Sequence, residues 1–250
     1  MMRKIVKAIS TIDELDIDLF KNLNIGVEIQ DFTEPNLRDV ELENLLVSYG
    51  ALLENFKGIK SLHGPFLDLK PASPDLKIRE VSYKRYLDTL KTAEKLAIDY
   101  VIFHSQINPY INIPSLKSLN NKQAKEMWEN LLVETDFKGI ILIENVFEEG
   151  PSMMKEYMET LELNNIRVNL DIGHARLGRS SLEEWISELK DFISYIHVHS
   201  NDRQYDRHEI PSVYEIENLY YLLDKYKINP VLSLEYKARN LKEEIKKYFS

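Results

Sequence analysis

The sequence contains no cysteine, and this absence narrows the chemistry open to the protein. Disulfide bonds, thiolate zinc sites and a cysteine nucleophile are excluded, so metal ligands must come from histidine, aspartate and glutamate. Long apolar runs are missing as well. No window approaches the roughly 18 to 20 continuous apolar residues that cross a bilayer, and the opening segment MMRKIVKAIS has too short an apolar run for a signal peptide. We therefore expect a soluble, cytoplasmic protein with no membrane partner.

Positive charge is scarce relative to negative charge. The chain has 32 Lys and Arg against 41 Asp and Glu, a formal net charge of -9 at pH 7. This balance argues against a surface that binds nucleic acid by charge alone, although a local basic cleft stays possible. Nucleic acid is thus a possible but not a favoured partner. The remaining composition, with 44% hydrophobic residues, is that of a globular protein whose 250 residues can bury a large core.

Short apolar runs alternate with longer amphipathic stretches along the chain, which is the pattern of βα units around a parallel sheet. Eight such units in about 250 residues is the usual size of a (β/α)8 TIM barrel, an α/β fold. No linker or low-complexity tract divides the chain, so we expect a single barrel domain over residues 1–250. The predicted strands are Lys4–Ile9, Ile25–Gln30, Ile59–His63, Tyr100–His104, Ile140–Glu144, Arg167–Asp171, Tyr195–His199 and Val231–Glu235.

Helical patterns fill most intervals between these strands. Ser181 stands before Leu182-Glu183-Glu184 as a capping-box candidate, and Pro151 leads into another helix. The first helix, around Ile12–Asn22, has the weakest signal. The clearest helical patterns are Lys77–Leu96, Lys122–Thr135, Ser152–Leu163, Ser181–Lys190, Ser212–Lys225 and Leu241–Phe249.

Polar side chains close or follow six consecutive predicted strands, from the third to the eighth. In a barrel of this kind the active site forms at the carboxyl ends of the strands, so these side chains converge on one place. Imidazole and carboxylate groups together suit divalent ions such as Zn, Mn, Fe or Co. The residues concerned are His63, His104, Glu144, Asp171, His174, His199, Asp206, His208 and Glu235.

Each of these residues also has an ordinary structural interpretation. A single strand-terminal histidine is more often a satisfied polar residue than a ligand, and Glu144 or Glu235 alone could form an ion pair at the barrel mouth. Asp171 and His174 could form a turn with a side-chain cap. These interpretations become weaker when the residues are taken together, because six consecutive strands each carry such a polar residue at the same end. We therefore predict a metal site.

Two polar residues are set apart from this group. His197 and His199 share a face of their strand because side chains two residues apart point the same way, but only His199 lies at the strand end. We therefore expect His197 to support the ligands from a buried layer. Glu28, within Gly26-Val27-Glu28-Ile29, is likewise expected to point inward in a supporting role.

In combination, these motifs resemble the xylose isomerase-like barrels, a superfamily that includes endonuclease IV and sugar or sugar-phosphate isomerases and epimerases. The resemblance runs from about Gly26 to Glu235 and covers most of the chain. Its motifs are His-Gly-Pro-Phe at 63 to 66, Ile-Glu-Asn at 143 to 145, Leu-Asp-Ile-Gly-His at 170 to 174, His-Ser-Asn-Asp at 199 to 202, Asp-Arg-His at 206 to 208 and the final Leu-Glu.

The resemblance implies two alternative sets of metal ligands. The isomerase branch needs one ion, which Glu144, Asp171, His199 and Glu235 would hold here. The endonuclease IV branch adds a further ion on His63, His104 and Glu144, and another on His174, Asp206 and His208. All nine positions carry the residue that this larger set requires, so the cofactors expected are two or three divalent ions, with zinc foremost and Mn, Fe or Co as alternatives.

The complete set favours hydrolysis of a phosphoester at a multinuclear site, with Glu144, Glu235 and His174 as the catalytic residues. The alternative is an isomerase or epimerase of a sugar or sugar phosphate, in which Glu144 and Glu235 exchange a proton beside a carbonyl. A DNA-repair endonuclease proper and a barrel that binds metal without turnover are less favoured. The expected substrate is a small phosphorylated or sugar-like molecule.

Substrate contacts are predicted at Phe66, Arg203 and Arg207, with the two arginines on a phosphate. Phe66 could instead pack at the barrel mouth, which is the commoner role of such a residue. The chain departs from endonuclease IV in the loop after Glu28, which has no arginine. This departure weakens the expectation of DNA binding. The chain also lacks the glycines usual in the family between Asp202 and Asp206, which weakens the expectation of substrate contacts on that loop.

Overall fold

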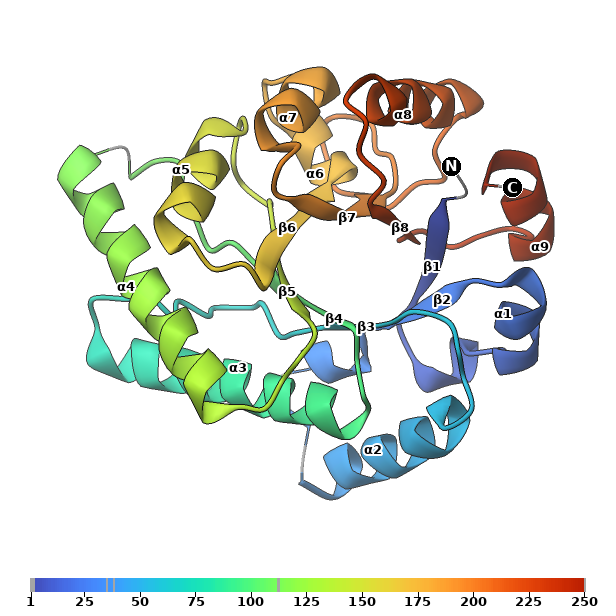
Figure 1. Cartoon of the computed structure of the whole chain (residues 1–250), viewed down its shortest axis with the longest axis horizontal. Coiled ribbons are helices and arrows are strands. Elements are labelled where there is room, and N and C mark those ends of the chain that lie inside the picture. Colours follow the sequence, from blue (N-terminus) through green and yellow to red (C-terminus); the bar gives the residue numbers. More distant parts are fainter. Residues whose placement is uncertain (1–2, 35, 38, 112, 250) are drawn as a thin grey trace.

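The structure is a computed structural model that describes residues 3–249 except 35, 38 and 112. Eight parallel strands pair in chain order and form a closed barrel, which β1 and β8 complete (Figure 1). The predicted (β/α)8 barrel is confirmed. The strands are β1 (Lys4–Ile9), β2 (Gly26–Ile29), β3 (Lys60–His63), β4 (Tyr100–His104), β5 (Ile140–Glu144), β6 (Ile166–Asp171), β7 (Ile193–Val198) and β8 (Val231–Leu234).

Helices surround the barrel and bury their apolar faces against the outer side of the strands (Figure 1). Trp128, Trp185 and Tyr86 are fully buried in this outer layer of the core. The α-helices are α1 (Ile17–Leu23), α2 (Asp39–Leu53), α3 (Leu76–Lys95), α4 (Pro114–Glu134), α5 (Ser152–Leu161), α6 (Ile172–Leu177), α7 (Leu182–Leu189), α8 (Val213–Lys225) and α9 (Leu241–Glu244). Two short 3-10 helices, η1 (Ile12–Glu14) and η2 (Asp31–Thr33), and a π-helix, η3 (Ile245–Phe249), complete the elements.

The helix boundaries follow local capping chemistry. Ser181 and Glu184 form the predicted capping box of α7, in which each side chain bonds the other residue's backbone N–H. Helix α4 begins at Pro114, well before the predicted Lys122, because proline is favourable in a first helical turn and the polar residues that follow tolerate helix. Helices α2 and α6 were not among the clear sequence patterns.

The barrel interior changes from apolar to polar along its axis. Val6, Ile102, Leu142 and Tyr195 pack together in the lower interior. Two residues further along their strands, Glu144 and His197 are buried as well, because side chains two residues apart share a face of a strand. The polar upper layer therefore lies directly beneath the carboxyl ends of the strands.

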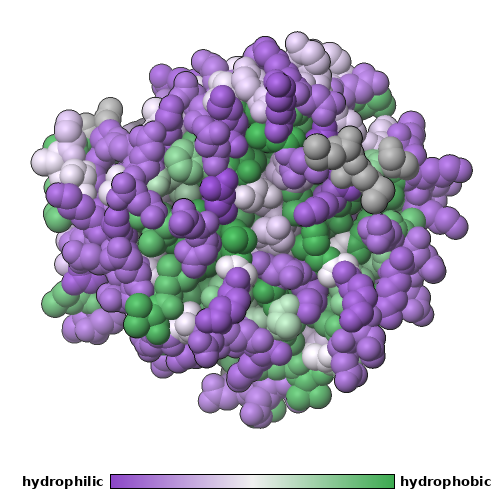
Figure 2. Space-filling view, in the orientation of Figure 1, coloured by the Kyte–Doolittle hydropathy of each residue, from purple (hydrophilic) through white to green (hydrophobic). Residues whose placement is uncertain are grey.

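Polar side chains cover most of the face seen in Figure 2, with apolar side chains between them and towards its middle. Within the described ranges, no helix combines the length and the apolar character needed to cross a membrane.

Candidate metal centre

A cavity of about 690 Å³ opens at the carboxyl ends of the strands, and we call it the mouth cavity. The loops after β2, β3 and β4 contribute Thr33, Leu67 and Gln106 to its lining. Asp171 and His199 lie beneath this lining and are almost inaccessible to solvent. The other seven predicted ligands line the cavity directly, namely His63, His104, Glu144, His174, Asp206, His208 and Glu235.

The first ligand group consists of His63, His104 and Glu144 at the ends of β3, β4 and β5. Glu144 Oε2 lies 3.5 Å from His63 Nε2, and its Oε1 lies 3.6 Å from His104 Nε2. Phe66 stacks on the His104 ring with a centroid distance of 4.5 Å. Phe66 therefore packs at the mouth against a predicted ligand, while its contact with substrate stays a prediction.

The second ligand group consists of Asp171, His199 and Glu235. Asp171 caps helix α6, because its Oδ1 accepts a hydrogen bond of 2.7 Å from the backbone N–H of His174. Its other oxygen, Oδ2, lies 3.0 Å from His199 Nε2. The two interpretations of Asp171, turn cap and ligand, are thus compatible, since each uses a different oxygen.

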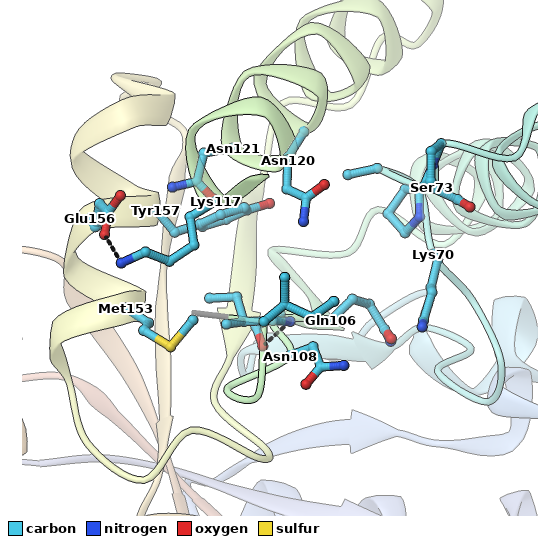
Figure 3. A pocket seen from close by; sticks show the side chains of 17 residues that line it. Lys70, Ser73, Gln106, Asn108, Lys117, Asn120, Asn121, Met153, Glu156 and Tyr157 are labelled. Carbon is cyan, nitrogen blue, oxygen red and sulfur yellow. Dashed lines mark hydrogen bonds and ion pairs between the residues drawn. The ribbon is translucent and has the colours of Figure 1, made fainter. Parts of the chain in front are cut away.

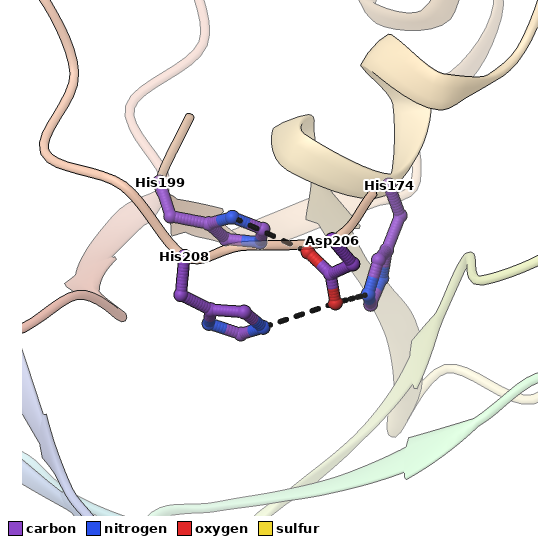
Figure 4. A group of neighbouring side chains, drawn as sticks. All are labelled: His174, His199, Asp206 and His208. Atoms are coloured by element: carbon purple, nitrogen blue, oxygen red, sulfur yellow. Dashed lines mark hydrogen bonds and ion pairs between the residues drawn. The ribbon is translucent and has the colours of Figure 1, made fainter. Parts of the chain in front are cut away.

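The third ligand group consists of His174, Asp206 and His208, with His199 beside them (Figure 4). Asp206 Oδ2 lies 3.1 Å from Nε2 of both His174 and His208. The rings of His199 and His208 stack in parallel with centroids 4.0 Å apart. His208 has a φ of 47°, a left-handed conformation that costs a non-glycine residue free energy and is concentrated at functional sites.

Gly173 makes room for one of these rings. A Cβ atom at this position would lie 2.0 to 2.5 Å from three atoms of the His199 imidazole. Glycine often permits a tight turn through a positive φ, but the φ of Gly173 is not positive and the residue lies in the first turn of α6. It is needed instead because a helix and a histidine ring approach each other closely here.

Three histidines direct Nδ1 at a backbone carbonyl, which leaves Nε2 available to a metal ion. The Nδ1–H groups of His63, His174 and His208 donate to the backbone carbonyls of Gly64, Asn145 and Glu235. A neutral ring with its proton on Nδ1 carries a lone pair on Nε2, and each of these Nε2 atoms faces a carboxylate oxygen. Two lone pairs facing each other repel unless a cation lies between them. The arrangement therefore fits a divalent ion, since ligand histidines usually donate their other N–H in this way.

The pKa values of these side chains in the absence of metal also show that the site favours positive charge. Burial lowers the pKa of His208, but Asp206 and Glu235 more than offset it and raise that pKa to about 9. Burial raises the pKa of Glu144, but His197 and His104 bring it well below its usual value. His104 differs because burial dominates and lowers its pKa to about 4, so its ring is neutral.

His197 is fully buried under the ligand groups, as predicted. Its Nε2 lies 3.1 Å from Glu28 Oε2, and its Nδ1 lies 2.9 Å from Glu235 Oε2 and 3.3 Å from Glu144 Oε2. The hydroxyl of Tyr195 also donates to Glu28. Glu28 is thus a buried carboxylate that orients His197, and His197 in turn contacts the predicted ligands Glu144 and Glu235.

Several amides that orient the ligands were missed by the sequence analysis. Asn169 Nδ2 donates to Glu144 Oε2 at 3.0 Å, and Gln30 Nε2 donates to Glu235 Oε1 at 2.8 Å. Asn145 exchanges two hydrogen bonds with the backbone of Asp171. The only signal available was a polar residue inside an apolar strand, as in Val168-Asn169-Leu170.

The predicted substrate contacts Arg203 and Arg207 both lie outside the lining of the mouth cavity. Arg207 Nε pairs with Asp202 Oδ2 at 3.0 Å. Arg203 lines a separate cavity between α6, α7 and α8. Their role in binding substrate therefore stays a prediction.

Comparison with known proteins places this geometry in a family. The model of the xylose isomerase-like TIM barrel family matches residues 26–248. The chain belongs to this family. One relative of this chain, the uncharacterised protein MJ1614 of Methanocaldococcus jannaschii, is 29% identical over 246 residues, which is 91% of each chain. The probable endonuclease 4 of Aquifex aeolicus is 28% identical over 178 residues, which is 63% of this chain and 62% of that protein.

Solved structures share the barrel. The TTHB071 protein of Thermus thermophilus, soaked with ZnCl2, superposes with a TM-score of 0.72 at 22% identity and covers 95% of this chain and 93% of its own. A D-tagatose 3-epimerase-like protein also has a TM-score of 0.72, at 21% identity, covering 98% and 96%. The chain is thus a member of a superfamily of metal-dependent enzymes, with buried His, Asp and Glu clusters that suit divalent ions.

Proposed function

We propose that this protein isomerises or epimerises a sugar or sugar phosphate in the mouth cavity. The observation that carries the proposal is the placement of Glu144 and Glu235. These carboxylates come from strands β5 and β8 and lie 3.3 and 2.9 Å from the same atom, His197 Nδ1. Two carboxylates that reach the cavity floor from different sides can serve one carbon atom from both faces.

Proton transfer by this pair gives the reaction. A bound divalent ion, held by Glu144, Asp171, His199 and Glu235, would polarise the substrate carbonyl. One of the two glutamates removes the proton from the carbon next to the carbonyl, and the other returns a proton on the opposite face or to the neighbouring carbon. His63, His174 and His208 would then bind substrate hydroxyl or phosphate groups.

The shape of the cavity and the similar proteins support this substrate class. About 690 Å³ is the size of a small-molecule site, and Lys70 is the one lysine or arginine in its described lining. A long basic groove, which DNA would require, does not line the described part of the cavity. Several similar solved structures are named as epimerases of sugars, including D-psicose 3-epimerase and L-ribulose 3-epimerase.

Solvent deuterium exchange tests the proposal. The metal-loaded protein in D2O should introduce deuterium next to the carbonyl of at least one ketose or ketose phosphate, as read by NMR. Glu235→Gln should abolish the exchange, and Glu217→Gln, on α8 away from the cavity, should not. Absence of exchange across a broad panel of ketoses, with the metal shown to be bound, would contradict the proposal.

A second candidate function is hydrolysis of a phosphoester, and the ligand groups beyond Glu144, Asp171, His199 and Glu235 favour it. His63 with His104, and His174 with Asp206 and His208, form two further clusters that a mononuclear isomerase does not require. Bound ions there would supply Lewis acids for both oxygens of a phosphoryl transfer. Glu144 would hold two neighbouring groups together, since its Oε1 faces both His104 of the first group and His174 of the third.

The number of ions separates the two candidates. Elemental analysis should find two or three ions per chain for the hydrolase, and His63→Ala and His208→Ala should each lose an ion together with hydrolysis of bis(p-nitrophenyl) phosphate. One ion per chain, with both variants fully active in proton exchange, would exclude the multinuclear hydrolase.

A further inference from the structure

A second cavity, of about 150 Å³, lies beside the metal centre between helices α4 and α5 and the loops that follow β3 and β4 (Figure 3). We call it the α4 cavity. Ala72, Ile107 and Met153 contribute apolar walls. Its polar lining consists largely of neutral side chains, among them Gln106, Asn108, Asn120 and Asn121. The mouth cavity, by contrast, is lined by carboxylates and imidazoles.

Two of these amides have no partner within the described chain. Asn120 and Asn121 project from α4, both are half-buried, and no hydrogen bond joins either side chain to another described residue. The charged group beside them is neutralised, because Lys117 Nζ bonds Glu156 Oε2 at 3.0 Å. A half-buried carboxamide offers two donors and one acceptor that need partners.

The size and chemistry of the cavity restrict what could occupy it. A cavity of about 150 Å³ holds a single six-membered ring. Neutral amides between apolar walls suit an uncharged ring that carries both hydrogen-bond donors and acceptors, because such a ring satisfies the amides without burying a charge. A purely apolar ring would leave Asn120 and Asn121 without partners.

The α4 cavity adjoins the mouth cavity. Lys70 and Gln106 line both. Gln106 Nε2 donates to the backbone carbonyl of Phe66, whose side chain also lines the mouth cavity, and Gln106 has a left-handed φ of 56°. The ammonium group of Lys70 has no ion-pair partner among the described residues, so it is free to contact an anionic group between the two cavities.

We propose that the α4 cavity is a binding site for the second ring of a two-part substrate, an uncharged polar ring such as a second sugar or a nucleobase. Lys70 contacts the group that connects this ring to the part held at the metal centre. The inference rests on the proposed function in one respect, that the mouth cavity holds the reacting part of the same molecule.

Titration with ring-sized probes tests this site without any turnover. Methyl β-D-glucopyranoside, uridine and benzyl alcohol are each added to the full-length protein, metal-loaded and metal-free, and binding is followed by calorimetry and saturation-transfer NMR. One of the two polar rings should bind in both states. The double variant N120L/N121L should weaken that binding by about tenfold or more, since two hydrogen bonds are lost. Asn44→Leu, an exposed helical asparagine on α2, is the matched control.

Lys70→Met gives a second measurement that does not depend on a half-buried position, because Lys70 is exposed. Glucose 1-phosphate or uridine monophosphate should bind more tightly than its neutral counterpart, and Lys70→Met should remove that difference. Comparison of the glucose and uridine probes shows whether the ring bound in the α4 cavity is a sugar or a nucleobase. Failure of both polar rings to bind, preferred binding of benzyl alcohol, or binding that N120L/N121L leaves unchanged would each overturn the proposal. Proton exchange at the metal centre is unaffected by these outcomes, so the two proposals fail separately.

Discussion

The mouth cavity and the α4 cavity adjoin each other, yet they are built from opposite kinds of polar group. The first concentrates the carboxylates of Glu144, Asp206 and Glu235 around histidine rings, whereas the second presents neutral carboxamides such as those of Asn120 and Asn121. Dense negative charge requires cations, while neutral amides require only hydrogen-bonding partners. The difference separates a place for ions and chemistry from a place for recognition.

The two cavities also differ in the elements that hold them. Strand ends carry most of the mouth ligands, and buried groups such as Asn169 and His197 fix their orientation. Helices and loops line the α4 cavity, and its free amides have no such support. Such supporting contacts hold side chains in the fixed geometry that metal coordination requires, whereas recognition of a ring does not require it.

The largest effect should come from removing a charge at the centre of the mouth cavity. Asp171→Asn keeps an oxygen to cap α6 but loses the carboxylate that faces His199. We expect loss of at least one bound ion and a fall in activity of more than about 100-fold, since even outer partners of a metal site are worth 10- to 100-fold. Elemental analysis and turnover measurements check this.

The matched control for that variant is Asp202→Asn, an exposed aspartate in the loop after β7. It should keep its ions, and so should N120L/N121L in the α4 cavity. If Asp171→Asn retained the wild-type metal content, the carboxylates of the mouth cavity would not be needed to bind ions. The two cavities would then not differ in the way described.

A smaller effect is expected one layer below the ligands. Glu28→Gln removes the charge that faces His197 Nε2 while keeping the shape of the side chain. Because His197 in turn contacts Glu235 and Glu144, metal affinity should fall by about 10- to 100-fold. Competition with a chelating dye measures this change, and Tyr195→Phe, which removes one donor to Glu28, should have a weaker effect. Unchanged metal affinity in Glu28→Gln would mean that Glu28 and His197 pack the barrel interior without supporting the metal ligands.

Most of the fold could be predicted from the sequence because it follows from strand periodicity. The ligand set, which stays a prediction, also needed the family resemblance, since His174, Asp206 and His208 lie beyond the strand ends. All eight strands lie within two residues of their predicted bounds at either end, and the residues that close them converge because a barrel brings strand ends together. His197 was separated from His199 by the same reasoning.

The α4 cavity and the supporting amides could not be predicted from the sequence, for a physical reason. Asn120 and Asn121 come together with Gln106 only through the packing of a helix against a loop, which no local pattern records. The start of α4 at Pro114 was missed because that turn is polar on all sides. The role of Gly173 depends on a ring from another strand, so it too required the structure.

The pH dependence of metal binding offers another way to compare the cavities. His208 has a pKa of about 9, so its ring carries a proton at pH 7 in the absence of metal, and neighbouring carboxylates also raise the pKa values of His63 and His174 despite their burial. A ligand ring must be neutral, so metal binding releases protons and the affinity should rise with pH up to about 9, by about tenfold per pH unit for each proton released.

Calorimetry in two buffers of different ionisation enthalpy counts the protons released on metal binding. Ring binding in the α4 cavity should be independent of pH over the same range, because carboxamides and hydroxyls do not titrate there. Metal affinity that stays constant between pH 6 and 9 would show that these histidines do not coordinate the ions.

The smallest effect should come from Glu148, which lies between the two cavities. It is buried and accepts hydrogen bonds from Ser105, which lines the α4 cavity, and from the backbone N–H of Val146, which lines the mouth cavity. Burial raises its pKa, and these hydrogen bonds lower it only in part. A carboxyl group with a raised pKa in the folded state stabilises the protein below its unfolded pKa, and this stabilisation is lost as the pH rises through the folded value.

The free energy of unfolding of the wild type should therefore fall relative to that of Glu148→Gln as the pH rises from 4 to 8. Urea unfolding at several pH values, with metal removed from both proteins, measures the difference. Glu149→Gln, the more exposed neighbour, should run parallel to the wild type. Parallel curves for Glu148→Gln as well would mean that this carboxyl group stays ionised, and the wall between the cavities would then carry a charge that neither cavity neutralises.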